Sequence, residues 1–156
     1  MDIVKILTNP VLFVPALSWL TAQVLKVIIN AIVNKKFVIS RLFGDGGMPS
    51  GHSATVTSLA VMCGLLTGFD SVPFAICTIL AIIVMHDATG VRHEAGKHAA
   101  FIVSIAEVIN EYLSEENEEI KTDKLKLLVG HTPLQVVCGA LLGVAIAICY
   151  YLIYLV

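Results

Sequence analysis

The feature that most limits the fold of this chain is a set of long stretches without charged residues. The last one, Thr132 to Val156, is uncharged for about 25 residues, whereas a helix needs about 20 apolar residues to cross a bilayer. Near the N-terminus, Ile6 to Val33 contains a single charged residue, Lys26. Charged residues make up only 14% of the sequence, compared with about 25% in soluble domains. An integral membrane protein is therefore predicted.

Two shorter uncharged stretches predict a helical hairpin. Ser53 to Phe69 and Ser71 to Met85 are separated by a Gly- and Pro-containing break that is typical of a turn. A polar segment at 86–97 reads as a loop, and His98 to Leu113 has the spacing of an amphipathic helix. Together these elements predict one all-α domain.

The predicted fold is a polytopic membrane helical bundle covering residues 1–156, with four to five membrane helices plus an interfacial amphipathic helix. If the amphipathic helix crossed the bilayer, His131 would lie on the opposite face from His52 and Arg92. We therefore expect it at the interface, where Glu107 and Glu111 are tolerated. Most Lys and Arg residues then share one face, which the positive-inside rule assigns to the cytoplasm, in the plasma membrane of a prokaryote.

The charge pattern argues against nucleic-acid binding, and the cysteine pattern argues against zinc or disulfide roles. The formal net charge is −2 and the basic residues form no stripe, which argues against nucleic acid as a partner. The cysteines lie inside apolar runs without CxxC spacing and are interpreted as packing residues. They are Cys63, Cys77, Cys138 and Cys149.

A glycine-rich segment directly before an apolar stretch predicts an anion site. Residues 44–53 read Gly-Asp-Gly-Gly-Met-Pro-Ser-Gly-His-Ser, so Ser50 and Gly51 can present backbone N–H groups at a helix N-terminus. The alternative is a plain loop in which Ser53 is the N-cap. Spacing alone leaves both open.

Several titratable residues crowd the other polar segments. They include His86, Asp87, Arg92, His93, Glu94 and His98. Simple interface residues would explain several of them. A metal site using His52 and His131 with members of this group is conceivable, but no HExxH-like spacing supports it. No metal or cofactor is expected.

His131 precedes the last apolar stretch. If Pro133 occupies the first helical turn, Gln135 follows His131 by four residues and lies on the same face. The alternative is structural: Thr132 as N-cap, and Gln135 as a buried hydrogen-bonding residue.

These motifs together resemble the divergent branch of the type 2 phosphatidic acid phosphatase family. The resemblance runs from about Leu25 to Gly143, and the combination of separated motifs is more specific than any one of them. Pro49-Ser50-Gly51-His52 matches the family's second motif intact, which implies that His52 is the general acid.

The family's third motif is split in this chain. Arg92 keeps its arginine, and His131 with Gln135 resembles the nucleophilic histidine and its partner, where the family has Asp. A rival alignment uses His98, but it places Ile102 at the Asp position, and an aliphatic side chain cannot orient imidazole.

The first motif is altered as well. Lys35 and Arg41 are one residue closer than the family spacing, and Leu42 replaces a proline. Lys26, a costly charge within an apolar stretch, is the substitute that we consider.

The resemblance implies metal-independent hydrolysis of a lipid phosphate or isoprenoid (di)phosphate through a phosphohistidine on His131. Arg92, Arg41 and Lys26 would neutralise phosphate oxygens. Gln135 cannot stabilise an imidazolium by charge, which leaves three alternatives. Asp87 or Glu94 supplies that charge, the activity is low, or the site binds phosphate without cleaving it.

Two other functions fit the same residues. A lipid or anion transporter or scramblase would use the cationic pocket without hydrolysis, and four or five spans would then call for a homo-oligomer. An inactive structural subunit would not depend on His52 or Arg92. The expected partners in all cases are membrane lipids and, for the enzyme, a phosphorylated amphiphile.

Overall fold

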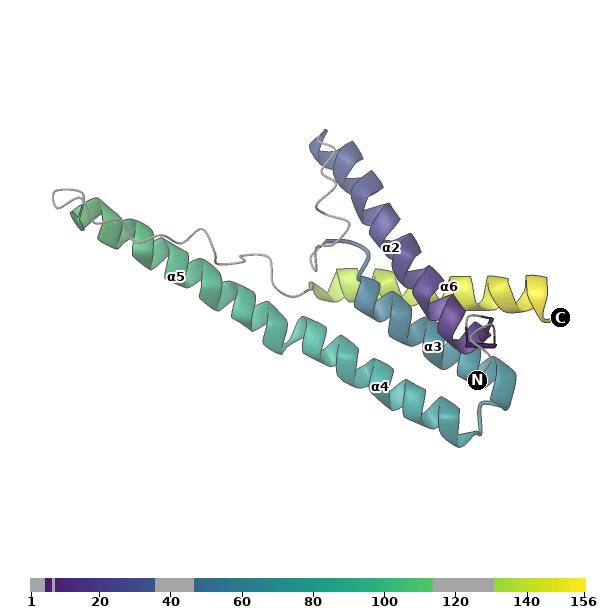
Figure 1. Ribbon diagram of the computed structural model, residues 1–156. Coiled ribbons are helices and arrows are strands. Elements are labelled where there is room, and N and C mark those ends of the chain that lie inside the picture. The colour runs from purple at the N-terminus through teal and green to yellow at the C-terminus, as the bar shows by residue number, and fades with distance from the viewer. Residues whose placement is uncertain (1–4, 7, 36–46, 114–130) are drawn as a thin grey trace.

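A computed structural model describes residues 5–6, 8–35, 47–113 and 131–156 of the chain, and within these it is helical without strands. The helices are α2 (Pro10–Asn34), α3 (Gly51–Thr67), α4 (Val72–Thr89), α5 (Val91–Leu113) and α6 (Pro133–Tyr154). Figure 1 shows α3 at the centre, where it packs against α2, α4 and α6. The predicted all-α membrane bundle is confirmed.

The number of membrane helices is slightly lower than predicted. Three described helical segments are long and apolar enough to cross a membrane, namely Pro10–Val33, Val72–Ile109 and Pro133–Tyr154. The α3 helix has 17 residues, which is about the lower limit for a span. Counting α3, the described part of the chain has four candidate spans at most, instead of four to five.

Side chains at the helix starts explain where the helices begin. Asn9, Ser50, Ser71 and Thr132 are the N-caps of α2, α3, α4 and α6, and each accepts a hydrogen bond from a backbone N–H in the first turn. The alternative in which Ser53 caps the second stretch is wrong, because Ser50 takes that position. Pro133 occupies the first turn of α6, as expected.

The polar segment at 86–97 is not a loop, and this prediction is wrong. α4 continues to Thr89, and α5 begins at Val91 after a break at Gly90, so the two helices form a nearly continuous rod that leaves the bundle (Figure 1). Apart from Gly90, the segment lacks glycine and proline up to Ala95, so nothing stops the helix. The predicted amphipathic helix at 98–113 is the second part of α5.

Small residues allow α3 and α6 to lie very close together. Gly139, Gly143 and Ala147 are buried and follow one another at four-residue spacing along α6. A Cβ atom at Gly139 would collide with the Ser50 carbonyl oxygen, and one at Gly143 would collide with that of Ala54. Such small-residue seams are how membrane helices gain van der Waals contact.

The apolar core lies away from the starts of α3 and α6. Val14, Met62 and Ala147 are fully buried against one another and join α2, α3 and α6. Beside them the Phe13 and Tyr150 rings pack on each other, with 5.9 Å between the ring centroids. By contrast, large apolar side chains on the outer faces are exposed, as expected for surfaces that face lipid.

Candidate phosphate-binding site at the helix N-termini

Two backbone hydrogen bonds bring three separate segments together. The Ser50 N–H donates to the Gln135 carbonyl at 2.9 Å, and the His131 N–H donates to the Ala88 carbonyl at 2.9 Å. The starts of α3 and α6 and the end of α4 therefore meet at one end of the bundle. His131 and the segment that leads to Arg92 lie at the same end.

The first turn of α3 offers a partial anion site. Ser50 is fully buried, and its N–H is already used by Gln135. Its Oγ accepts from the Ser53 N–H at 3.3 Å. Gly51, at the first helical position, has no intrahelical acceptor for its N–H. The Gly51 N–H is therefore better placed than that of Ser50 to meet an anion.

The orientation of the His131 ring follows from the capping box of α6. Gln135 Oε1 accepts the Thr132 N–H at 3.2 Å and lies 3.1 Å from His131 Nδ1. Because the Thr132 N–H can only donate, the Gln135 atom must be the oxygen, and Nδ1 must then carry the hydrogen. The lone pair of the neutral imidazole is thereby left on Nε2.

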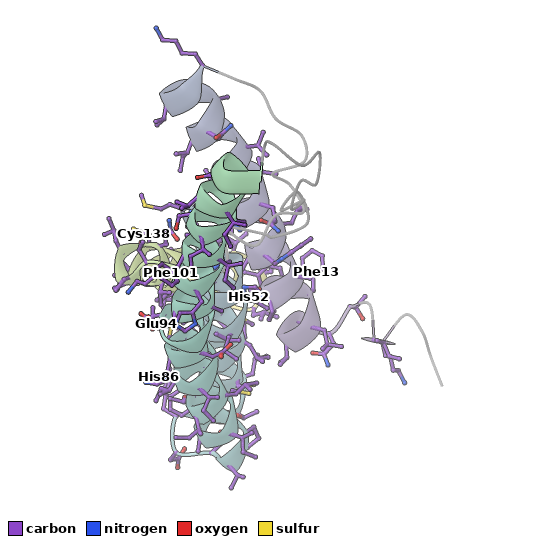
Figure 2. The ribbon with its side chains drawn as sticks, turned by 90° about the vertical axis from the view of Figure 1, so that its left-hand side faces the viewer. Phe13, His52, His86, Glu94, Phe101 and Cys138 are labelled. Atoms are coloured by element: carbon purple, nitrogen blue, oxygen red, sulfur yellow. The ribbon has the colours of Figure 1, made fainter. Side chains whose placement is uncertain are left out.

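The two histidines lie side by side. His131 is 2% exposed, and the centroid of its ring is 6.1 Å from that of His52 in an edge-on arrangement. His52 comes from the first turn of α3, beside α2 (Figure 2). The two imidazoles, from the start of α3 and the residue before α6, therefore belong to one cluster.

Lys26 approaches the site from the middle of α2. It is 5% exposed, and its Nζ lies 3.8 Å from the position that a Cβ would take at Gly51. Its aliphatic stem passes Gly47, whose φ of +100° suits glycine. The structure thus brings a cation next to the start of α3.

The other residues of the predicted site are placed differently. Asp87 is half-buried and directly precedes Ala88, so its backbone adjoins His131. Arg92 lies in the first turn of α5, with its side chain outside what the structure describes, and Arg41 lies outside the described residues. The structure thus brings Lys26, Ser50, Gly51, His52, His131 and Gln135 together.

Residues on α5 lie away from this group. Glu94 forms an exposed ion pair with Lys97 at 2.7 Å on the side of α5 (Figure 2). Among the described helices, α5 contacts only α4, so His98 is not brought to the start of α3. This geometry favours His131 over the rival alignment.

Two further residues near the site were not anticipated. Trp19 and Gln23 precede Lys26 by seven and three residues, and the Trp19 ring lies beside the position that a Cβ would take at Gly51. The spacing i, i+4, i+7 was the available signal. Within the described part of the chain, no group of three or more His, Cys, Asp or Glu side chains is suited to hold a metal ion.

Comparison with known proteins identifies the family. The sequence model described as "Divergent PAP2 family" matches residues 7–146. The membrane protein YuiD of Bacillus subtilis (strain 168) is 40% identical over 150 residues, covering 92% of this chain and 95% of YuiD. No solved structure matches the chain. The predicted resemblance is confirmed, and the chain belongs to the Divergent PAP2 family of membrane proteins.

Proposed function

We propose that this protein is a membrane-embedded phosphatase that hydrolyses a lipid phosphate or isoprenoid (di)phosphate through a phosphohistidine, without a metal ion. The observation that carries the proposal is that Gln135 Oε1 accepts hydrogen bonds from both the Thr132 N–H and His131 Nδ1. With the hydrogen on Nδ1, the lone pair on Nε2 of His131 is the proposed nucleophile.

In the first step, His131 Nε2 forms a bond to phosphorus and the bond between phosphorus and the leaving oxygen breaks. His52 gives its proton to that oxygen, a role worth about 10²- to 10⁴-fold in rate. The 6.1 Å between the ring centroids keeps both imidazoles in one cluster, which supports their acting on the same phosphate. In the second step, water loses a proton to His52, attacks phosphorus and releases phosphate from His131.

Charge on the phosphate oxygens would be met by Lys26 and the Gly51 N–H, with Arg92 and Arg41 as the predicted guanidinium ligands. The position of Lys26 Nζ, 3.8 Å from the Cβ site of Gly51, supports this role. Preorganised donors of this kind contribute most where water is excluded. The active face is proposed to be cytoplasmic, in a prokaryotic plasma membrane.

Gln135 sets the expected rate. An amide holds the ring in one tautomer but does not offset the charge that develops on His131, and losing a carboxylate from such a position costs about 10⁴-fold in a serine protease. Asp87 is the nearest carboxylate in sequence to the Ala88 carbonyl and is the proposed source of compensating charge. Replacing Gln135 with Asp should therefore raise the turnover number at least tenfold.

The central experiment compares the wild-type protein with His131→Ala in proteoliposomes. We expect phosphate release to fall to background in the variant, together with loss of an acid-labile phosphoprotein. Lipid flux across the bilayer is measured in the same vesicles. Unchanged hydrolysis in His131→Ala would eliminate the nucleophile, and flux of intact lipid without phosphate release would favour the transporter or scramblase function.

A further inference from the structure

Three residues of α2 form a continuous wall beside the start of α3. Trp19, Gln23 and Lys26 share one face of the helix because they are spaced i, i+4 and i+7. The Cβ position of Gly51 lies 3.3 Å from Trp19 Cδ1, 3.6 Å from Trp19 Nε1 and 3.8 Å from Lys26 Nζ. Gln23 lies between these two contacts along the helix, so all three face the site.

The wall is buried at Lys26 and Gln23 and exposed at Trp19. Lys26 and Gln23 are each 5% exposed, whereas Trp19 is 40% exposed. Indole combines a large apolar ring with one N–H donor, which suits a boundary between hydrocarbon and polar groups. Trp19 therefore marks the side on which the wall meets lipid.

One buried polar atom of the wall has no hydrogen-bond partner within the residues that the structure describes. It is Gln23 Oε1, on a side chain that is 5% exposed. Leaving a buried polar atom unsatisfied is unfavourable. The oxygen therefore indicates a bound group that carries a hydrogen-bond donor.

The wall lies alongside hydrocarbon and not at the end of its helix. α2 continues for eight residues after Lys26 to Asn34, about 12 Å of helix. Ile28, Ile32 and Val33 on this extension are 46%, 71% and 71% exposed. Lys26 thus lies within an apolar helix, at a level where α2 faces hydrocarbon.

We propose that Trp19, Gln23 and Lys26 bind the polar neck of a phosphate-monoester lipid, which enters from the bilayer past Trp19. The P–OH of the singly protonated phosphate monoester, a donor that a diester lacks, donates to Gln23 Oε1. The ester oxygens next to the phosphate accept from the Trp19 N–H, and the other phosphate oxygens contact Lys26 and Gly51. Trp19 and Gln23 are specificity-determining residues in this arrangement. The inference rests on the proposed function for the identity of the phosphate site.

The first test uses Trp19 as the reporter, because it is the single tryptophan of the chain. The full-length protein is placed in phosphatidylcholine nanodiscs with added phosphatidic acid, and tryptophan emission is recorded. We expect a saturable change with phosphatidic acid, and none with phosphatidylglycerol, whose phosphate is a diester. An equal response to inorganic phosphate alone, or no response to phosphatidic acid, would overturn the lipid-neck assignment.

The second test separates Gln23 from general stability. Gln23→Leu keeps the volume but removes the hydrogen-bonding atoms, and we expect about tenfold weaker phosphatidic acid binding with an unchanged melting midpoint. Leu20→Ala is the matched control, since Leu20 is 49% exposed on the same helix, and its binding should stay within twofold. Equal binding by Gln23→Leu and wild type would contradict the proposal.

Hydrolysis is measured in parallel so that the two proposals fail separately. Trp19→Phe should raise KM for phosphatidic acid about tenfold while leaving hydrolysis of a soluble aryl phosphate within twofold. Binding with the emission change but without hydrolysis in any variant would refute the phosphatase and leave the lipid site standing. Hydrolysis that Trp19→Phe and Gln23→Leu leave unchanged would refute the lipid-neck site alone.

Discussion

The two ends of the bundle formed by α2, α3 and α6 are both buried but differ in chemistry. At one end, Val14, Met62 and Ala147 are fully buried hydrocarbon. At the other end, where the middle of α2 passes the starts of α3 and α6, Lys26, Ser50 and His131 are 5%, 0% and 2% exposed. Burying polar groups is unfavourable unless they are paired, and a charge within a membrane helix is by default functional. The packing of α2, α3 and α6 is therefore stabilised mainly at the apolar end, whereas the candidate functional residues lie at the polar end.

The largest effect should come from removing the buried charge. Lys26→Met should lower kcat/KM for a lipid phosphate by about 10²- to 10³-fold, the usual cost of losing one group that stabilises the transition state. Its helicity and melting midpoint in detergent should not fall, because methionine fills a similar volume. Lys97→Met serves as the control, since Lys97 is exposed on α5. If Lys26→Met unfolds the protein, the separation of the two ends is wrong.

The converse change at the apolar end should affect stability alone. Met62→Ala should reduce the free energy of unfolding by about 2 kcal/mol or more, because Met62 is fully buried and truncation leaves a cavity. At temperatures where the variant is folded, kcat/KM should stay within twofold of wild type. Ile76→Ala, at a position 63% exposed on α4, should change neither. Denaturation followed by circular dichroism, with phosphate-release assays, checks this prediction.

The two glycines of α6 test whether the close packing of α3 and α6 also positions the site. Gly139→Ala and Gly143→Ala both push a Cβ into a carbonyl of α3, and each should cost about 1–3 kcal/mol of stability. Gly139 meets the Ser50 carbonyl, within the site, whereas Gly143 meets Ala54 and Thr57 one turn away. Only Gly139→Ala should also lower kcat, about tenfold, when both variants are assayed in the folded state. Equal kcat values for the two variants would show that the seam does not position the site.

Local pattern predicted most of the helices and several residues of the site. The uncharged stretches located α2, α3, α4 and α6, and the Thr132-Pro133 pair gave the start of α6. The prediction of a loop at 86–97 is wrong because polar residues also occur within helices, as the exposed Glu94 and Lys97 of α5 show. Charge density is a weaker signal of helix ends than glycine, proline and capping residues.

The sequence by itself determined that the protein lies in a membrane, that it is helical and that it carries the family motifs. These properties depend on the composition and spacing of neighbouring residues. Only the tertiary structure decided that Lys26 reaches Gly51, that Ser50 bonds to Gln135 and that His98 stays outside the site. These placements depend on residues far apart in the chain, and the bond between Ser50 and Gln135 depends on how closely α3 and α6 approach. Gly139 and Gly143 permit that approach, which no local pattern specifies without its partner helix.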